Sequence, residues 1–240
     1  VTSKYSNCQD ADLKNFTLRE NIMINSADKQ QFVISQITDS FGQRDFSGYD
    51  LAGINLKELD LTGVNFTGAN LSNANLSRAI LTNAKLDKAN LVQASLREAH
   101  MHEASFEQAN LTNADLTKAS LCGAIFIGAD FSDSNLQEAS LCDTDLRKAN
   151  LSKSQLIEAS LIEANLFLAN LQNAKLCGAN LLEANLNQAN LKGADLAWVN
   201  LTQANLKEAN LQGANFYNTK FDQAIMPDGR IKQVQIFCFS

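Results

Sequence analysis

The chain has 240 residues, of which 45% are hydrophobic, and a formal net charge of −6 at pH 7. This acidic balance argues against nucleic acid or an anionic membrane surface as a partner. No apolar run approaches the roughly 20 residues of a membrane-spanning helix. The N-terminus lacks the apolar stretch of a signal peptide, and the five cysteines contain no CxxC motif, so we expect reduced thiols and a cytoplasmic location.

Residues 1–45 form an N-terminal segment with two parts. Residues 11–25 look like three imperfect five-residue units, with centres at Leu13, Leu18 and Met23. Residues 27–41 then carry apolar side chains at helical spacing, namely Val33, Ile37 and Phe41. Because Ser26 is a suitable N-cap and Gly42 a suitable stop, a short helix is predicted at about 27–41.

A five-residue repeat occupies residues 46–226. Every fifth residue from Phe46 to Met226, which we call the centre of a unit, is Leu, Phe or Met at all 37 positions. The residue two positions before a centre, which we call the inward position, is Ala in 27 of 36 cases from residue 49 to residue 224. The residue directly before the centre is mostly Asn or Asp. A typical unit is Ala69-Asn70-Leu71-Ser72-Asn73.

A period of five fits neither a helix nor a continuous strand. The two apolar positions of each unit are two residues apart, so they share a face if the backbone there is extended. The other three positions are mostly polar, and the chain has to turn before the next unit to keep its apolar pairs on one side. In a helix, by contrast, the leucines would spiral around all sides. The pattern therefore predicts a solenoid wound around a Leu/Ala core.

The A(N/D)Lxx units resemble those of pentapeptide repeat proteins over about three quarters of the chain. The opening GQRDFSGYDLAGINL and the ending AIMPDGR are similar to those of cyanobacterial members. The resemblance implies an all-β fold, a right-handed quadrilateral parallel β-helix in which four units make one coil. At about 4.8 Å per coil, about nine coils make a rod about 43 Å long.

The ends of this β-helix need covering, because an open end exposes unpaired strand edges. In the first coil the inward positions hold Tyr49, Ile54, Leu59 and Val64 in place of Ala, so we expect the 27–41 helix to cap this end. At the other end Pro227 stops the repeat. The apolar tail, residues 227–240, is expected either to cap the last coil of a monomer or, as the resemblance to gyrase-targeting members implies, to pair with a second copy.

Residues twenty apart are expected to stack into columns. One column, which runs from Asp50 to Asn210, consists of Asn and Asp and is expected to form a structural ladder of hydrogen bonds. Ser134, Thr144 and Ser154 replace inward Ala, and we expect their hydroxyls to bond to the backbone.

No catalytic residue, cofactor site or metal site is predicted. His102, Cys122 and Cys142 fall in one column, with Glu103 alongside, but a straight column offers poor tetrahedral geometry for zinc. A shared zinc ion and a Cys122–Cys142 disulfide are the alternatives to plain surface. Because the chain shows no phosphate loop, no paired carboxylates in a cleft and no substrate cavity, it is not expected to be an enzyme.

A partner surface is predicted in the middle and upper coils. The position after the centre holds Cys122, Cys142, Ile162 and Leu182 on four successive coils, where other columns are mostly polar. An acidic column runs beside it. The predicted surface consists of Cys142, Ile157, Ile162, Glu163, Phe167, Leu168, Leu182, Glu183 and Trp198. Because apolar patches rimmed by charge tend to mark interaction sites, the expected partner is a protein whose apolar surface is flanked by Lys or Arg.

Two functions are compatible with these features. The first is a non-enzymatic protein-binding or scaffold module that presents the rigid surface of the β-helix. The alternative, implied by the resemblance to quinolone-resistance members of the family, is DNA mimicry at DNA gyrase or topoisomerase. Residues 46–226 carry 19 acidic and 13 basic side chains. Their difference is a net charge of −6. Because about 43 Å of DNA duplex carries about 25 negative charges, this charge is too small for a DNA mimic and the first function is preferred.

Overall fold

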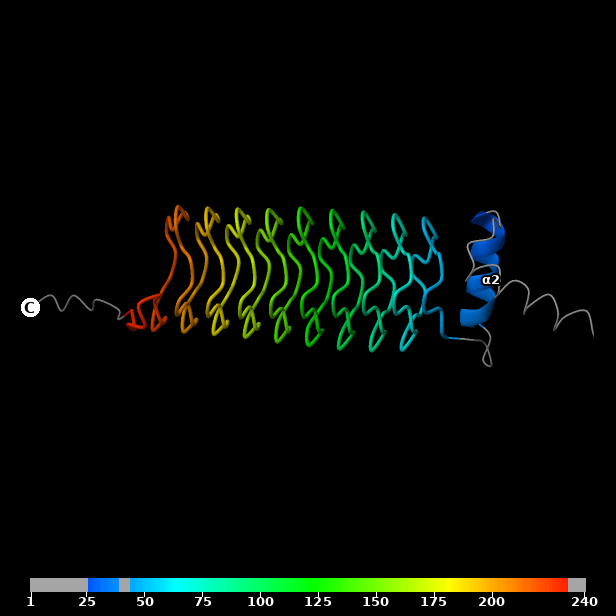
Figure 1. Cartoon of the computed structure of the whole chain (residues 1–240), viewed down its shortest axis with the longest axis horizontal. Coiled ribbons are helices and arrows are strands. Elements are labelled where there is room, and N and C mark those ends of the chain that lie inside the picture. The colour runs from blue at the N-terminus through cyan, green and yellow to red at the C-terminus, as the bar shows by residue number, and fades with distance from the viewer. Residues whose placement is uncertain (1–25, 39–43, 233–240) are drawn as a thin grey trace, which may run out of the picture.

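The computed structural model describes residues 26–38 and 44–232. Its main body is a rod of stacked coils, and helix α2, Ser26–Thr38, lies at one end (Figure 1). The predicted helix is therefore present and begins one residue earlier than expected, while Phe41 and the predicted stop at Gly42 lie outside the described residues. The imperfect units in residues 11–25 and the tail beyond Lys232 lie outside the described residues. No described helix has the length and hydropathy needed to cross a membrane.

The β-structure of the rod consists of single parallel bridges rather than longer strands. Each of these bridges joins residues twenty apart, from Asp45–Asn65 to Asn205–Ile225. Four five-residue units therefore complete one coil, as predicted. The register is unbroken through the repeat, so no loop projects from it.

The backbone hydrogen bonds of one unit explain its length. The amide of Leu51 donates to the carbonyl of Asn70 on the next coil at 2.7 Å, and the amide of Gly53 donates to Ser72 at 2.8 Å. The amide of Ile54 returns to the carbonyl of Leu51 at 3.1 Å and closes a turn. Each side of the rod is thus a narrow parallel sheet, and each corner is a turn of two residues.

Where Asn precedes a centre, its side chain can form two kinds of hydrogen bond. Oδ1 of Asn70 accepts from the amide of Ser72 at 3.2 Å, and Nδ2 of Asn70 donates to Oδ1 of Asp50 on the preceding coil at 2.8 Å. Asn90 donates in turn to Asn70 at 3.0 Å. Asn and Asp suit this position because their short side chains reach the backbone two residues ahead. The predicted ladder is confirmed, with a gap at Asn110 among the bonds of the described residues.

The second residue of each turn has a left-handed backbone, whether or not it is glycine. Glu163 has a φ of 57° and Trp198 a φ of 62°. For residues other than glycine this conformation costs about 1–2 kcal/mol. The hydrogen bonds between coils offset that cost, because they impose the same turn on every unit.

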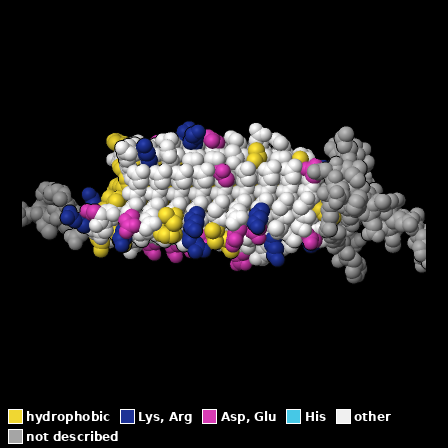
Figure 2. Space-filling model, in the orientation of Figure 1, with side chains coloured by type: hydrophobic (Ala, Val, Ile, Leu, Met, Phe, Trp, Pro, Cys, Tyr) yellow, Lys and Arg dark blue, Asp and Glu magenta, His cyan; other side chains and the backbone are white. Residues whose placement is uncertain are grey.

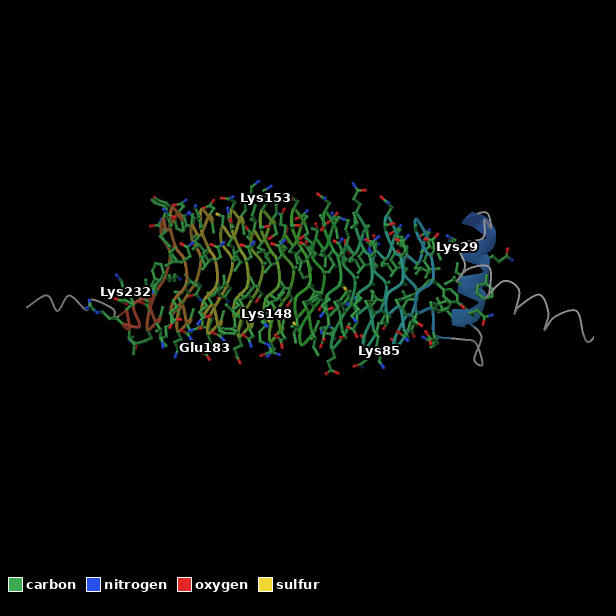
Figure 3. All side chains as sticks on the ribbon, in the orientation of Figure 1. Lys29, Lys85, Lys148, Lys153, Glu183 and Lys232 are labelled. Carbon is green, nitrogen blue, oxygen red and sulfur yellow. The ribbon has the colours of Figure 1, made fainter. Side chains whose placement is uncertain are left out.

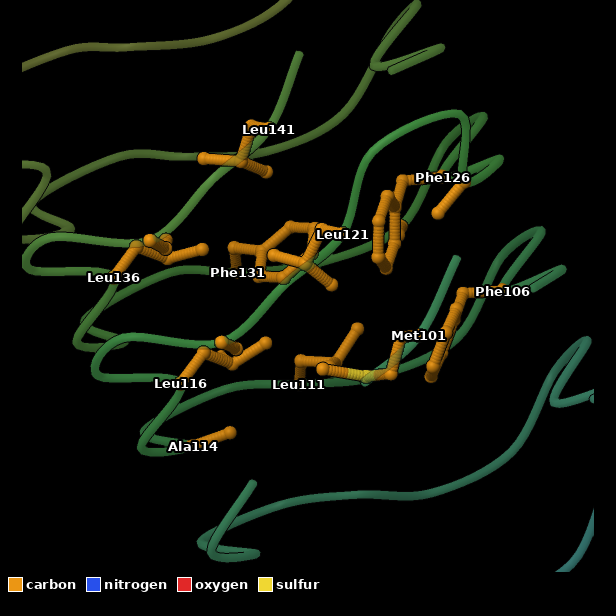
Figure 4. Close-up of a cluster of buried hydrophobic side chains, with 14 of the residues drawn as sticks. Met101, Phe106, Leu111, Ala114, Leu116, Leu121, Phe126, Phe131, Leu136 and Leu141 are labelled. Carbon is orange, nitrogen blue, oxygen red and sulfur yellow. The ribbon is translucent and has the colours of Figure 1, made fainter. Parts of the chain in front are cut away.

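The centres and the inward alanines fill the interior of the rod. Figure 4 shows centres from Met101 to Leu141 pointing into the interior from successive sides. The rings of Phe106 and Phe126 stack at a centroid distance of 4.7 Å, and Phe131 meets Phe126 at 5.0 Å. Full burial of one Leu side chain contributes about 1.5–3 kcal/mol. The repeated apolar pair is therefore the main source of stability.

Three hydroxyl groups replace alanine inside the rod without disturbing it. Ser134, Thr144 and Ser154 are buried, and each hydroxyl donates to the backbone carbonyl three residues earlier at 2.7 Å. The predicted bonding of these hydroxyls to the backbone is confirmed.

Helix α2 covers the first coil with its apolar face. Phe32, Val33 and Ile37 are buried in the same cluster as Phe46 and Tyr49. Oε1 of Gln30 accepts a hydrogen bond from the amide of Asn55 at 3.1 Å. Asn55 belongs to the first coil, where no preceding coil offers a carbonyl. The helix therefore supplies an acceptor that the β-helix lacks at this end.

The last coil ends in a hairpin. Ile225 pairs antiparallel with Ile231, and the amide of Met226 donates to the carbonyl of Arg230 at 2.8 Å. The last centres are half-buried where inner centres are fully buried, namely Leu211, Phe216, Phe221 and Met226. Figure 2 shows hydrophobic side chains gathered at this end of the rod, on the left. Among the described residues, an apolar surface therefore remains at the last coil.

Candidate functional site

We name the four sides of the rod after the four centres in the coil of residues 161–180. In chain order these are the Leu161, Leu166, Leu171 and Leu176 sides. Residues at twenty-residue intervals belong to the same side, because they are bridged. The Leu161 side thus lies between the turn of Ile157 and Glu158 and the turn of Ile162 and Glu163.

The turn after the Leu161 side carries the apolar stripe, which consists of Cys142, Ile162 and Leu182 on successive coils. Their side chains are half-buried. Cys142 shows the reason, because its Sγ lies 3.2 Å from Oγ of Ser160 on the next coil. The first turn residue leans against the following coil, so the stripe is partly covered by its own neighbours.

The same turn carries an acidic row, which consists of Asp143, Glu163 and Glu183. All three side chains are exposed. Figure 3 shows Glu183 projecting from the rod on the edge opposite Lys153. Among the ion pairs of residues 26–38 and 44–232, none involves a member of the acidic row.

The column at the other edge of the Leu161 side, which is also the turn after the Leu176 side, arranges its charges differently. Arg78 lies between Glu58 and Glu98, at N–O distances of 3.6 and 2.9 Å. Lys118 pairs with Glu138 at 3.4 Å. Alternating signs along a column therefore form ion pairs between coils in this fold. The acidic row lacks that alternation, so the described chain leaves its charge uncompensated.

The remaining members of the predicted surface lie at two other turns. Ile157 and Trp198 belong to the turn before the Leu161 side, whereas Phe167 and Leu168 belong to the turn after the Leu166 side. These two turns are diagonally opposite in a four-sided coil. The nine predicted residues therefore border two adjacent sides, which share the turn of Ile162 and Glu163. Those that border the Leu161 side are Cys142, Ile157, Ile162, Glu163, Leu182, Glu183 and Trp198, while Phe167 and Leu168 stand apart.

Trp198 and Tyr217 form an exposed aromatic pair at the turn before the Leu161 side. Their side chains are 60% and 63% exposed, and their rings meet edge to face at a centroid distance of 5.7 Å. The sequence analysis did not select Tyr217. The twenty-residue register could have identified it, because Tyr217 is twenty residues after Ala197 and therefore lies in the same turn as Trp198 on the next coil.

The column of His102, Cys122 and Cys142 contacts serines rather than a shared ion. Nε2 of His102 lies 3.0 Å from Oγ of Ser120, and Sγ of Cys122 lies 3.1 Å from Oγ of Ser140. Both cysteines are free thiols. In the part of the chain that the structure describes, no three His, Cys, Asp or Glu side chains are grouped as metal ligands. This geometry gives no support to the zinc or disulfide alternatives.

A cavity of about 610 Å³, which the sequence analysis did not expect, lies between α2 and the first coil. Its walls include Ile34 of the helix and Ala52 and Ile54 of the coil. Lys29 also lines the cavity and is paired with Asp50 at 3.4 Å. Of the polar groups in the lining, Lys29 is held by Asp50 and the hydroxyl of Ser35 donates to the carbonyl of Phe32 at 2.7 Å.

The repeat matches the family of pentapeptide repeats in eight copies. The matched residues are 45–83, 74–113, 89–126, 124–161, 164–203 and 189–226. Comparison with curated proteins gives no match.

Solved structures of pentapeptide repeat proteins are similar to this chain. HetL, a pentapeptide repeat protein involved in heterocyst differentiation regulation from the cyanobacterium Nostoc sp., is 30% identical; the match covers 88% of this chain and 100% of HetL, with a TM-score of 0.46. Trypsin-treated QnrB1, a plasmid-mediated fluoroquinolone resistance protein, is 20% identical over 70% of this chain and 88% of its own, with a TM-score of 0.50. Rfr23 from the cyanobacterium Cyanothece is 37% identical over 45% of this chain and 64% of its own, with a TM-score of 0.23.

The family match covers most of the described residues. The likeness to QnrB1 concerns the fold alone. Together they establish a right-handed β-helix solenoid, in a family whose members are generally structural or binding proteins rather than enzymes. The chain belongs to the pentapeptide repeat family.

Proposed function

We propose that this protein is a non-enzymatic binding or scaffold module that holds a protein partner on the Leu161 side of its middle and upper coils. The observation that carries the proposal is the apolar stripe with the acidic row directly beside it. Apolar surface rimmed by charge tends to mark an interaction site. Because the β-helix holds both columns in register, the partner meets a surface that is already ordered.

The expected partner has an apolar surface flanked by Lys or Arg. The acidic row and the net charge of −6 favour such a protein over nucleic acid or an anionic membrane. Salt screens the contact with Glu163 and Glu183 but not the contact with Ile162 and Leu182. Binding is therefore expected to weaken, without vanishing, when NaCl is raised from about 0.1 M to about 1 M.

Site-specific photo-cross-linking tests this function. A benzoylphenylalanine at position 182 is expected to cross-link a partner in a lysate of the source organism. The same group in place of Gln172 is the matched control, because Gln172 is the first turn residue of the diagonally opposite turn. The partner is then identified and its affinity for the full chain is measured directly.

The variant that decides the outcome is Ile162→Glu combined with Leu182→Glu. Both side chains are half-buried at the surface, so a modest change in melting temperature is expected, and that measurement shows that the variant is folded. Loss of partner binding in the folded variant supports the proposal. Partner binding that survives both substitutions overturns it.

DNA mimicry remains the alternative, and the rod shape is the observation that favours it. The charge distribution opposes it, because cations such as Arg78 and Lys118 alternate with carboxylates along one edge of the rod. A DNA supercoiling assay with gyrase and a fluoroquinolone distinguishes the two functions. If the protein at stoichiometric concentration protects gyrase from the fluoroquinolone, DNA mimicry is supported and the binding-module proposal is overturned.

A further inference from the structure

We propose that the partner presents a cationic amphipathic helix that lies along the rod on the Leu161 side, between Trp198 and the apolar stripe. The apolar face of this helix contacts Ile162, Leu182 and Trp198. Its Lys and Arg side chains contact the carboxylates at both edges of the side. This inference rests on the proposed function and adds the charge and the secondary structure of the partner segment.

Carboxylates lie at both edges of the Leu161 side in its middle coils, whereas lower on one edge Arg78 and Lys118 alternate with carboxylates. Glu163 and Glu183 of the acidic row lie at one edge. Glu158 lies at the other, in the column of Trp198. Cγ of Glu158 is 3.4 Å from the place where a Cβ on Gly178 would stand, so this side chain extends up the column towards the next coil. Among the ion pairs of the described residues, none involves these three carboxylates.

The missing ion pairs are informative because this fold forms them elsewhere. Lower in the same column as Glu158 and Trp198, Arg78 bridges Glu58 and Glu98. Carboxylates stacked about 4.8 Å apart on successive coils repel one another. A cationic partner relieves that repulsion, which complements the apolar contact with Ile162 and Leu182.

Trp198 is difficult to explain by the stability of the chain alone. Its side chain is 60% exposed, and its φ of 62° is a conformation that favours Gly or Asn. On the coil before it, Gly178 occupies the equivalent position. The left-handed backbone is common to this turn position, so the informative feature of Trp198 is its large exposed aromatic side chain. Trp is also enriched among the residues that dominate the energy of protein interfaces.

The spacing of the coils favours a helix over an extended segment. Successive coils present equivalent side chains about every 4.8 Å, whereas a helix presents one turn about every 5.4 Å. Over three intervals the two repeats differ by about 2 Å. An extended segment presents same-face residues about every 6.6 Å, so over the same three intervals it drifts by about 5 Å.

The backbone of the Leu161 side also disfavours strand addition. The amide of Leu161 donates to the carbonyl of Asn180, and the amide of Asn180 donates to Ala159. These groups are used between coils, so the side is a sheet face and not a free edge. A partner meets side chains there, as an amphipathic helix does in a hydrophobic groove.

Selection from two displayed peptide libraries tests the inference on the full-length protein. One library places apolar residues at positions 1, 4, 8 and 11 of a helix-forming frame, and the other places them at alternate positions of a strand-forming frame. The remaining positions are randomised in both. We expect enrichment from the helical library, with Lys and Arg selected on the flanks of the apolar face. No binder from the helical library, or binders mainly from the alternating library, overturns the proposal.

Charge reversal provides the matched control. Glu163→Lys with Glu183→Lys is expected to weaken the selected peptides at least tenfold. Lys is compatible with this backbone, because Lys118 and Lys153 occupy equivalent left-handed positions with φ of 58°. Asp133→Lys reverses one charge in the Lys153 column of the diagonally opposite turn, so it is compared with Glu163→Lys alone, and it is expected to leave affinity unchanged. Equal effects of these two single reversals would show non-specific attraction only.

Trp198→Gly separates a binding role from a structural one. Gly is suited to the left-handed backbone, so the variant should remain folded with little change in melting temperature. We expect at least a tenfold loss of peptide affinity, and unchanged affinity contradicts the role of Trp198.

Failure of this inference is distinguishable from failure of the proposed function. If a natural partner cross-links at position 182 through an extended or uncharged segment, the proposed binding function holds and the inference of a cationic helix is wrong. Absence of any partner at that position, together with full binding by the Ile162→Glu and Leu182→Glu variant, removes both.

Discussion

Nε of Arg78 donates a hydrogen bond of 2.9 Å to Oε2 of Glu98 on the next coil. This bond, reinforced by charge attraction, raises the pKa of Arg78 and lowers the pKa of Glu98 from their ordinary values. The two residues are twenty apart, so their contact is a direct consequence of the coil length. The same column continues with Lys118 and Glu138, which are paired at 3.4 Å.

Removing the arginine is expected to raise the pKa of Glu98. Its folded pKa is lowered, so its contribution to stability is present above its unfolded pKa and is lost as pH falls through the folded value. Carboxyl NMR titration of the parent and of Arg78→Ala measures the shift. High NaCl should reduce the lowering of the Glu98 pKa in the parent, because the Arg78–Glu98 pair is exposed and therefore screened. An identical titration of Glu98 in both proteins contradicts the assignment.

The asparagine ladder is expected to contribute to stability through its bonds between coils. Asn170 donates to Asn150 and accepts from Asn190, both at 3.0 Å, whereas Asn110 bonds only to Thr112 among the side-chain contacts described. Asn170→Ala should therefore cost about 1–3 kcal/mol more than Asn110→Ala. Urea unfolding of the two variants measures the difference, and equal losses would show that bonding within the turn is what matters.

Neighbouring residues at positions 161 and 162 test which side chains point inward. Leu161 is fully buried and Ile162 is half-buried. Leu161→Ala is expected to cost about 2–5 kcal/mol, because it leaves a cavity in the core. Ile162→Ala is expected to cost about 1 kcal/mol or less. Comparable losses in thermal unfolding would reverse the assignment of the two faces.

Replacing the buried hydroxyl of Ser134 should have a small effect. Its Oγ donates to the carbonyl of Phe131 at 2.7 Å, but that carbonyl also accepts the amide of Ser134 at 3.1 Å. The carbonyl therefore keeps a partner in Ser134→Ala, and alanine is the usual residue at this position. We expect a change within about 1 kcal/mol. A loss well above that, measured by calorimetry, would indicate a role for the hydroxyl that the bond does not explain.

The C-terminal tail is expected to cap the last coil rather than to join two copies. The exposed side of that coil contains half-buried Phe216 and Phe221, which any oligomeric state has to cover. A chain that ends at Lys232 keeps the hairpin that pairs Ile225 with Ile231. Light scattering should find a monomer with and without the tail, and the shorter chain should melt at a lower temperature. A dimer that dissociates on truncation would establish the tail as an interface.

The sequence by itself determined the repeat, the coil and the core. A period of five with apolar residues two apart predicts a solenoid that buries every Leu, and the resemblance to pentapeptide repeat proteins implies four units per coil. Asn or Asp before the centre supplies both the ladder and an acceptor for the turn. Stacking then follows by counting twenty residues, which correctly placed Ser134 inside and Asn70 above Asp50. These features depend on local geometry that is the same in every unit.

The tertiary structure decided how the outward residues are grouped. Counting along the chain placed Ile157 and Phe167 on sides adjoining that of Ile162, with Trp198 further up the rod. The bridged coils show that Phe167 and Trp198 lie at diagonally opposite turns. They also show that the Ile162 column leans against the next coil and that Tyr217 meets Trp198. The physical reason is that the outward direction of a side chain depends on the corner at which its turn falls, and a corner is a property of the closed coil rather than of a single unit.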